Sequence, residues 1–252
     1  KQNVQKQIKY GEDIKSNKKG YAYFNDLFVK RHRSILMSSA KKIAAVSFFI
    51  IIAAISISMV REDIKKILNE ITLNFLPYFV FIMYIINRGQ VVTQAMFMNC
   101  DHSMLTYSFY RKPKAILGLF KERLKSVILI NLFPAIVIGV GLALILYVTG
   151  GTDNIYNYYV LIVSIASMSI FFSVHYLVMY YCMQPYNYNS EIKDSRYKIV
   201  SAITYIVCYF TLQLKLPTFY FGVFTVCFSI IYCLASLLIA YRIAPKTFKI
   251  KV

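Results

Sequence analysis

Six long apolar segments constrain this chain more than any other feature of its sequence. They lie at about residues 43–60, 71–87, 126–148, 158–181, 198–214 and 218–241. Each approaches the ~17–25 residues that an α-helix needs to cross the hydrocarbon core of a bilayer. The segments lack the alternation of a β-strand, and a helix satisfies its own backbone hydrogen bonds in lipid. The sequence therefore predicts an all-α integral membrane protein with six transmembrane helices.

Composition and charge support a membrane protein. The chain is 58% hydrophobic and 16% charged, with a mean hydropathy of +0.53. These values exclude a disordered protein and disfavour a soluble domain. The formal net charge of +18 would point to nucleic acid in a soluble protein. Because the basic residues flank apolar segments here, we expect a lipid bilayer as the partner and no nucleic acid.

The basic residues also predict an orientation. Most of the 29 Lys and Arg lie in four regions holding 11, 7, 3 and 4 of them, namely residues 1–42, 87–126, 182–198 and 242–252. The others are Arg61, Lys65, Lys66 and Lys215. Cytoplasmic loops carry the excess of Lys and Arg. The alternation predicts a multi-pass protein of the plasma membrane with both termini in the cytosol.

The N-terminal region, residues 1–42, is predicted to be a basic cytosolic arm that ends in an amphipathic helix. The apolar face of this helix holds Tyr23, Phe24, Leu27, Phe28, Ile35 and Leu36, and the other face holds Lys30, Arg31 and Arg33. Such a helix lies in the headgroup plane, as an elbow before the first span. The transmembrane domain follows at 43–241 and a basic cytosolic tail at 242–252. A start at Lys1 fits either trimming or a piece of a longer polypeptide.

The segment from Asn87 to Ser126 connects the second and third apolar segments and holds seven basic residues against two acidic ones. Pro113 suits the first turn of a helix, and a stripe of apolar residues follows it at helical spacing. Upstream, Asp101 is a candidate N-cap for a short helix. We expect short basic helices that lie on the membrane and present a surface to the cytosol. An ordinary positively charged loop is the alternative.

The apolar segments offer few groups for chemistry. None has an acidic or basic residue near its centre, which argues against proton pumps, ion-coupled carriers and voltage sensors. His175 is either a pathway contact or a neutral histidine that hydrogen-bonds a neighbouring helix. Asn131 and Pro134 either open backbone groups to a pathway or merely kink their helix. Ala166, Ser169 and Ser173 form a stripe of small residues that favours helix packing over a cofactor site.

Known catalytic and nucleotide-binding motifs do not occur in the sequence. GxxxxGK[ST], HExxH and GxSxG are all missing, and the five cysteines have neither CxxC nor paired spacing. We therefore expect no enzyme, no metal and no cofactor in this chain. If transport is driven by ATP, the ATP and Mg belong to a separate subunit.

One stretch of the connecting segment resembles a known family. It is CDHSMLTYSFYRKPKAILGLFKERLKSVILIN, from Cys100 to Asn131, with an acidic turn, an apolar helix, an aromatic–Arg–x–Pro motif and a basic helix before the third span. This pattern is similar to the Ecs-type permeases of Gram-positive bacteria, within the ABC type-two class of exporters. The resemblance extends over about residues 20–245, mostly as topology that many membrane proteins share.

The resemblance implies a function and a set of partners. The chain would be a permease subunit whose coupling helix docks on an ABC ATPase, with a second copy or a sister half completing the pathway. The docking residues would be Asp101, His102, Met104, Leu105, Tyr107, Phe109 and Arg111, of which Met104, Leu105, Tyr107 and Phe109 are expected to be exposed. The possible pathway residues are Asn131, Pro134 and His175. For the unknown substrate, the family suggests a peptide or an amphiphile.

Two other function classes stay open. A membrane-embedded enzyme would need clustered carboxylates or a Ser/His pair at membrane depth, where the segments offer only His175 and scattered hydroxyls. A non-transporting immunity or sensor subunit would dock the same ATPase, and its sequence would look the same as that of a transporter. Transport measured in reconstituted vesicles separates these classes.

Overall fold

The computed structural model describes residues 15–187 and 191–249, and nearly all of them are helical. The α-helices are α2 (Gly20–Arg31), α3 (Arg33–Val60), α4 (Glu62–Asn74), α5 (Leu76–Ile86), α6 (Gly89–Met96), α7 (His102–Met104), α8 (Pro113–Val148), α9 (Tyr156–Met183), α10 (Ser195–Phe210) and α11 (Thr218–Thr247). Three short turns of π or 3-10 helix are η1 (Phe97–Asp101), η2 (Ser108–Arg111) and η3 (Thr211–Gln213). In these two ranges, the only β-type pairing is an isolated bridge between Tyr186 and Ile192.

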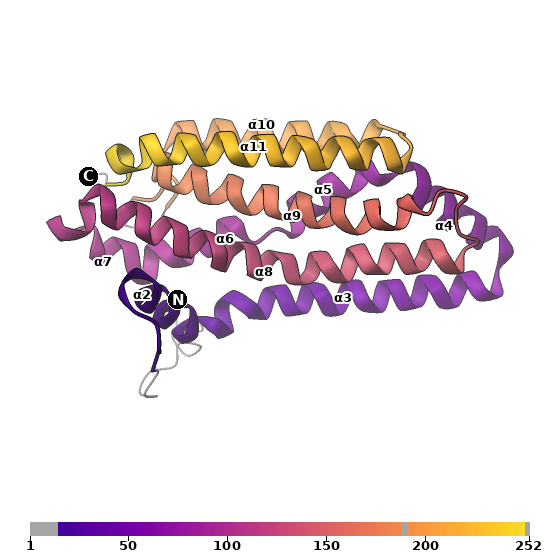
Figure 1. Cartoon of the computed structure of the whole chain (residues 1–252), viewed down its shortest axis with the longest axis horizontal. Helices are drawn as coiled ribbons and strands as arrows, with labels where there is room; N and C mark the ends of the chain where they lie inside the picture. Colours follow the sequence, from indigo (N-terminus) through magenta and orange to yellow (C-terminus); the bar gives the residue numbers. More distant parts are fainter. Residues whose placement is uncertain (1–14, 188–190, 250–252) are drawn as a thin grey trace.

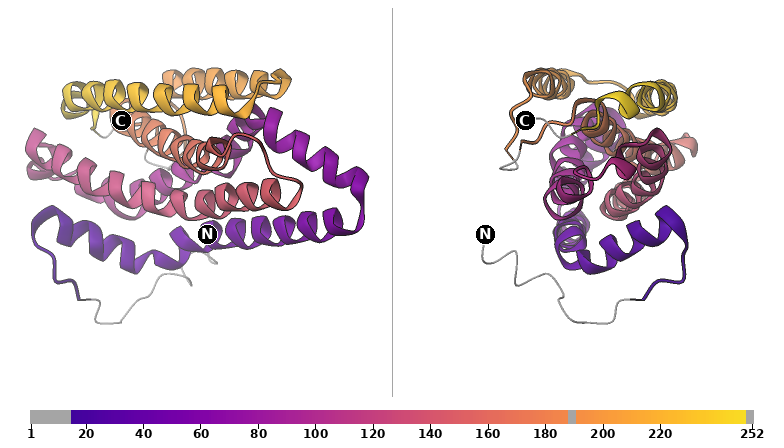
Figure 2. Two further views of the ribbon diagram at one scale, coloured as in Figure 1. Left: turned by 45° about the vertical axis from the view of Figure 1, so that its right-hand side comes forward. Right: turned by 90° about the vertical axis from the view of Figure 1, so that its left-hand side faces the viewer.

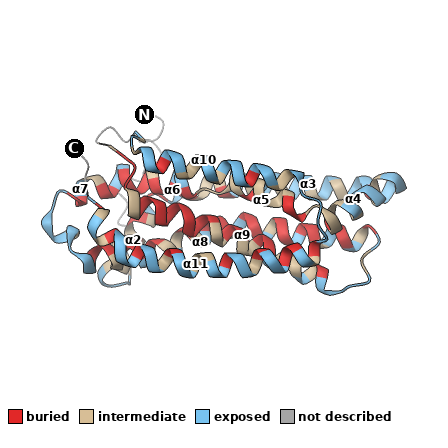
Figure 3. Cartoon of the chain, turned by 90° about the horizontal axis from the view of Figure 1, so that it is seen from above, coloured by how far each residue is buried: buried red, intermediate tan, exposed pale blue. Residues whose placement is uncertain are grey.

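Five helices, α3, α8, α9, α10 and α11, run lengthwise in one elongated bundle (Figure 1). Helix α9 lies at its centre, where it packs most extensively against α8 and α11. Buried residues accordingly follow α8 and α9, whereas α10 and α11 expose much of their surface (Figure 3). A helix that is apolar on all sides is expected in such a central position. The exposed apolar faces of α3, α10 and α11 suit contact with lipid.

Four of the six apolar segments form long helices. The stretches Leu36–Val60, Pro113–Val148, Tyr156–Met183 and Thr218–Thr247 are each long and apolar enough to cross a bilayer. They contain the predicted spans at 43–60, 126–148, 158–181 and 218–241. The prediction of an all-α membrane protein is therefore confirmed at this level.

The second segment, residues 71–87, is not one continuous helix as expected. It is divided at Phe75 between α4 and α5, and the stretches Glu62–Asn74 and Leu76–Met104 are bent by 80° relative to each other. Pro77 lies in the first turn of α5, where its missing N–H is tolerated but the preceding helix is interrupted. The freed carbonyl of Asn74 accepts a hydrogen bond from the Leu216 N–H at 3.1 Å. The pair can cross the bilayer only as a broken span.

The fifth segment, residues 198–214, is shorter than expected as an α-helix. Helix α10 has 16 residues and ends in the 3-10 turn η3. At about 1.5 Å per residue it extends for about 24 Å, less than the ~30 Å hydrocarbon core of a bilayer. The polar Gln213 and Lys215 follow directly, as the sequence indicates.

The expected amphipathic helix before the first span is divided into two parts. Helix α2 runs across the bundle axis, as the end-on view in Figure 2 shows, and α3 then turns into the bundle. The division is at His32, whose Nδ1 lies 2.9 Å from the Phe28 carbonyl oxygen and whose ring stacks on Phe28. The tract at residues 1–14 lies outside the described residues.

The basic connections gather at one end of the bundle. Helices α3 and α8 begin there, and α9 and α11 end there (Figure 1). This end, called the basic end below, is formed by residues 15–42, 97–126, 182–187, 191–198 and 242–249. The short connections α3–α4, α8–α9 and α10–α11 lie at the opposite end. The sequence regions rich in Lys and Arg therefore lie together at one end of the folded bundle.

Gly118 tests the packing of α2 against α8. A Cβ atom at this position would collide with the Tyr21 ring of α2. We predict that Gly118→Leu displaces α2 and lowers the free energy of unfolding by about 1–3 kcal/mol, the usual cost of overpacking. Thermal unfolding in detergent, with tryptic cleavage after Lys30 and Arg31, measures both effects. Lys121→Leu, at an exposed position of α8, is the control. Equal behaviour of the two variants would contradict the packing.

Candidate functional site: the connecting segment at the basic end

The candidate site is the connecting segment between α5 and α8, called the connecting segment below and comprising residues 87–112. It leaves α5 inside the bundle, returns to the basic end through α6 and η1, and turns through α7 and η2 into α8 (Figure 1). Two polar clusters attach it to the rest of the bundle. The first lies at the break between α5 and α6, and the second surrounds Asp101.

At the first cluster, side chains replace the backbone bonds that the break between α5 and α6 removes. The Asn131 Oδ1 of α8 accepts a hydrogen bond from the Arg88 N–H at 2.8 Å, and the Asn87 Oδ1 accepts one from the Gly89 N–H at 2.8 Å. Gly89 is required by close approach, since a Cβ there would collide with Tyr176. Broken helices are tolerated within a bundle when neighbours satisfy the freed groups in this way.

Asn131 therefore links three helices. Its Nδ2 donates to the Ser173 Oγ of α9 at 3.0 Å and to the Val127 carbonyl oxygen at 3.1 Å. Its side chain is buried, and Pro134 is buried one turn further along α8, which continues without interruption to Val148. Close to Asn131, the Asn87 Nδ2 and Arg88 Nε are buried without a hydrogen-bond partner among the described residues. The break is thus a polar point inside the bundle with two unused donors.

At the second cluster, Asp101 and Arg123 form a buried ion pair. The side chains are each 2% exposed. The Arg123 Nη1 donates to the Asp101 Oδ2 at 2.6 Å, and its Nη2 donates to the Oδ1, so the contact is bidentate. Bidentate pairs of this kind are the strongest and most directional ion pairs in proteins. The pair connects η1 directly to α8.

Three further groups complete the hydrogen bonding of this pair. The Tyr180 hydroxyl donates to the Asp101 Oδ2, the Arg123 Nη1 donates to the Tyr181 hydroxyl at 2.9 Å, and the Arg123 Nη2 lies 3.6 Å from the Cys100 Sγ. Removal of two charges from water costs several kcal/mol per ion, and only good geometry and full hydrogen bonding compensate for it. The two tyrosines come from the end of α9, so the cluster fastens the connecting segment to α8 and α9 together.

Aromatic rings enclose the ion pair. The Tyr181 ring stacks on Phe248 at 4.3 Å and meets Phe120 edge-on at 5.0 Å. The Tyr180 ring lies 5.8 Å from that of Tyr186, which in turn stacks on Phe97 at 5.3 Å. Burial raises the pKa of Tyr186 to about 12, so its hydroxyl stays protonated. The rings exclude water and thereby strengthen the electrostatic attraction inside the cluster.

The expected docking residues divide into a buried and an exposed group. Asp101 is in the ion pair and makes no side-chain capping bond to α7, contrary to the prediction of an N-cap. Met104 and Leu105 were expected to be exposed, but they are buried in the core at 7% and 4% exposure. That expectation was wrong because both side chains pack inward beneath the turn. A charged substitution at either position would disturb the core rather than an outer surface.

The exposed group forms a tip, defined as residues 106–114. Tyr107 and Phe109 are 66% and 56% exposed, as predicted, and Arg111 is exposed beside them. Lys112 and Lys114 add positive charge, with the Lys112 ammonium 5.7 Å from the centre of the Phe109 ring. The Tyr110 ring lies 6.1 Å from Phe24 of α2 and holds the tip from behind. His102, at the start of α7, is half-buried against Phe97.

His175 lies elsewhere, between α9, α10 and α11. Its Nδ1 is 2.6 Å from the Tyr232 hydroxyl, and its Nε2 is 3.1 Å from the Thr204 hydroxyl. The Phe171 ring stacks on the imidazole at 5.9 Å. His175 is thus a hydrogen-bonded link between three helices, the second of the two roles expected for it. The structure does not bring it together with Asn131 and Pro134 in one site.

The chain was also compared with known proteins. No protein-family model, no curated protein and no solved structure matches it. Within the described ranges, no group of three or more His, Cys, Asp or Glu side chains could hold a metal ion. The site is therefore characterised by its own geometry: a buried anchor, and an exposed aromatic and basic tip.

The sequence analysis did not assign Arg123, Tyr180 and Tyr181 to the candidate site. A signal for Arg123 was present, because it continues the apolar stripe of Ile116, Phe120 and Val127 at helical spacing. A charged residue on an apolar stripe requires a buried partner. Asp101 is one of only two acidic residues in the segment from Asn87 to Ser126, so the ion pair could have been predicted from the sequence.

We predict that the ion pair behaves as a coupled unit in a double-mutant cycle. Asp101→Asn and Arg123→Gln should each lower the free energy of unfolding by about 3–5 kcal/mol, because each leaves the other charge buried and unpaired. The double variant should lose less than the sum of the two. Thermal unfolding in detergent measures these differences, with Arg111→Gln as an exposed control.

Cys100 provides a second readout of the same cycle. Its side chain is buried beside the pair, so maleimide labelling of a variant that keeps Cys100 alone should be slow. Labelling should become faster in both single variants and less so in the double variant. Wild-type rates in Arg123→Gln, together with an unchanged stability, would contradict the role of the pair.

Proposed function

We propose that this chain is the transmembrane permease subunit of an ATP-driven ABC exporter of the type-two class. A separate ATPase subunit, which carries the ATP and Mg, docks on the tip at residues 106–114. The exported substrate is unidentified, with peptides and amphiphiles as the classes to test first. The proposal treats the chain as a coupling and transport component and not as an enzyme.

The observation that carries the proposal is the contrast between the tip and its base. Tyr107 and Phe109 expose large aromatic surfaces next to three basic side chains, at the same end of the bundle as the other basic connections. Exposed aromatic residues and arginine are typical of the hot spots of protein interfaces. The base beneath them is rigid, because Asp101 is held by Arg123 and Tyr180.

This geometry also supports a route for mechanical coupling. A force applied to the tip reaches α7 and η1 through the buried Met104 and Leu105, and reaches α8 and α9 through Arg123 and the two tyrosines. Rigid-body movement of packed helices is an established way to transmit such changes. ATP-dependent movement of the partner would thus alter the position of the central helices.

The membrane arrangement is part of the proposal. All six apolar segments cross the plasma membrane, the second as the bent α4–α5 pair and the fifth as α10 with η3. Helix α2 lies in the headgroup plane as an elbow, and both termini are cytosolic. The clustering of the basic connections at one end supports this orientation.

We place the pathway beside the break between α5 and α6. The two unused donors of Asn87 and Arg88 lie next to Asn131, and interrupted helices often mark binding sites in transporters. One bundle of this size has too few helices to enclose a wide channel. We therefore propose that a second copy or a sister half completes the pathway. Pro134 lies on the same helix, whereas His175 serves as a helix link.

We predict that the tip determines ATPase binding. Tyr107→Ala and Phe109→Ala should each weaken ATPase binding by about 2 kcal/mol, the level of an interface hot spot, while leaving the fold intact. The tagged chain is purified from its native membranes, the co-purified nucleotide hydrolysis is measured, and the bound subunit is identified by mass spectrometry. Tyr147→Ala, at a side chain 73% exposed at the opposite end, is the matched control.

Two outcomes would overturn the proposal. One is wild-type protein that carries no nucleotide-hydrolysing subunit. The other is equal ATPase activity with the Tyr107, Phe109 and Tyr147 variants. Reconstituted vesicles that transport a substrate only with the ATPase present would separate a transporter from a docking subunit without transport.

A further inference from the structure

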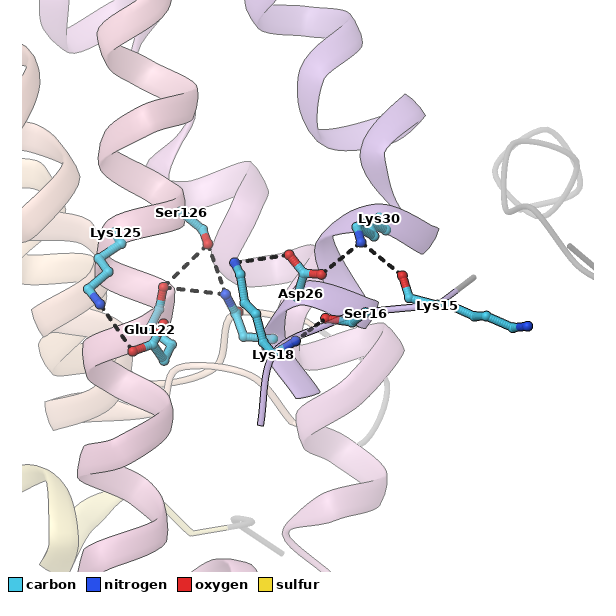
Figure 4. Close-up of polar contacts among 9 residues, drawn as sticks. Lys15, Ser16, Lys18, Asp26, Lys30, Glu122, Lys125 and Ser126 are labelled. Atoms are coloured by element: carbon cyan, nitrogen blue, oxygen red, sulfur yellow. Dashed lines mark hydrogen bonds and ion pairs between the residues drawn. The ribbon is translucent and has the colours of Figure 1, made fainter. Parts of the chain in front are cut away.

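A small cavity lies outside the site described above, where α2 crosses α8 and the first turns of α3. Its volume is about 260 Å³. Polar side chains of Lys18, Asn25 and Asp26 line one side, and Met37 and Leu129 are among the apolar side chains on the other. Figure 4 shows the polar contacts of this region. A cavity of this volume is smaller than the ~300–1,000 Å³ of sites for drug-sized ligands, but it has room for a headgroup.

Asn25 lines this cavity and has a buried acceptor without a donor among the described residues. Asn25 is only 6% exposed. The Nδ2 donates to the Ser126 Oγ at 2.9 Å and to the Glu122 carbonyl oxygen at 3.3 Å. Because a carbonyl oxygen only accepts, this contact fixes which end of the amide is nitrogen. The Oδ1 is then buried without a donor in the described part of the chain. A ligand hydroxyl group that enters beside Asn25 and displaces the side chains covering this atom would supply one.

The mouth of the cavity keeps positive charge. Two ammonium groups, those of Lys18 and Lys30, share the single carboxylate of Asp26 at 3.0 Å each (Figure 4). The hydrogen bond from Ser16, with those from the two lysines, lowers the pKa of Asp26 to about 2, so the carboxylate is ionised at neutral pH. The nearby Glu122 carboxylate is engaged by Lys125 at 3.2 Å. One lysine charge therefore remains available for an anion.

In the proposed membrane arrangement, the apolar side of the cavity is at the level of the headgroups. Met37 lies at the start of the apolar stretch Leu36–Val60, and Leu129 lies three residues into the predicted span at 126–148. Leu129 is 67% exposed on the outer surface of α8. A lipid whose headgroup enters the cavity can thus lay an acyl chain along α3 and α8 without leaving the bilayer.

We propose that this cavity binds the headgroup of an anionic glycerophospholipid that carries free hydroxyl groups, such as phosphatidylglycerol. The phosphate pairs with Lys18, a hydroxyl donates to the Asn25 Oδ1, and an acyl chain covers Met37 and Leu129. A zwitterionic amine headgroup fits less well, because its ammonium group would be a third cation beside the single Asp26 carboxylate that Lys18 and Lys30 already share. The assignment to the cytosolic leaflet rests on the orientation in the proposed function.

The bound lipid would link α2 to α8 next to the ion-pair cluster. Asn25 already contacts the backbone of Glu122, the residue before Arg123. The lipid therefore supports the α8 turn from which Arg123 reaches Asp101. Loss of the lipid should loosen α2 first, because α2 crosses the bundle and packs on it by one face.

Native mass spectrometry of the detergent-purified chain tests this assignment. Phosphatidylglycerol, phosphatidylethanolamine and phosphatidylcholine are titrated separately, and inorganic phosphate and glycerol phosphate are added as competitors. The net charge of +18 attracts any anionic lipid, so the decisive comparison is between two variants of equal charge. These are Lys18→Ala, in the cavity, and Lys198→Ala, exposed on α10 at the same end.

We expect phosphatidylglycerol to bind tightest and Lys18→Ala to weaken it about fivefold, the effect of one lysine beside an anionic lipid. Lys198→Ala should bind as the wild type does. Asn25→Asp, which keeps an acceptor but adds a negative charge, should weaken binding further. Equal affinity of the two lysine variants, or equal affinity for phosphatidylethanolamine, would overturn the proposal. Displacement of the lipid by equimolar phosphate or glycerol phosphate would also overturn it, by assigning the cavity to a soluble anion. None of these outcomes depends on an ATPase, so they are distinct from failure of the proposed function.

Discussion

The buried contact between Asp101 and Arg123 fixes the relative positions of three parts of the chain. Asp101 belongs to η1, Arg123 to α8, and the tyrosines that complete their hydrogen bonds to the end of α9. A charge in such a place is tolerated only when its partner and all donors are aligned. The contact is therefore specific to one arrangement of the connecting segment, in which Met104 and Leu105 face inward and Tyr107 and Phe109 face outward.

The broken second segment makes this arrangement possible. A single straight helix through residues 71–87 could not contain both the 80° bend after Asn74 and the polar break before Gly89. Instead, the chain bends at Phe75 between α4 and α5, and after the break before Gly89 α6 continues toward the basic end, packed against α9 and α8. The hydrogen bonds of Asn87 and Asn131 satisfy the freed backbone groups. At this break, the irregular backbone is thus satisfied by neighbouring side chains, as a membrane environment requires.

The sequence predicted the parts of the fold that depend on local composition. Long apolar runs become helices whatever their neighbours are, so the helices containing 43–60, 126–148, 158–181 and 218–241 were predictable. The bend after Asn74 was not, although Pro77 signalled an interruption, because its angle depends on how α4 packs. At the site, exposure of Tyr107 and Phe109 was predicted correctly. Met104 and Leu105 were misplaced, since an apolar residue in a basic connection fits a docking surface and a small core equally well until the tertiary contacts are known.

Hydrogen–deuterium exchange of the Arg123→Gln variant tests most directly whether the ion pair holds the connecting segment in place. The wild-type protein should protect the backbone amides of residues 97–105, and the variant should exchange them markedly faster. The amides of α4 (Glu62–Asn74), at the opposite end of the bundle, should exchange alike in both proteins and serve as an internal reference. Wild-type protection of residues 97–105 in the variant would contradict the account, because the segment would then be held by apolar packing alone.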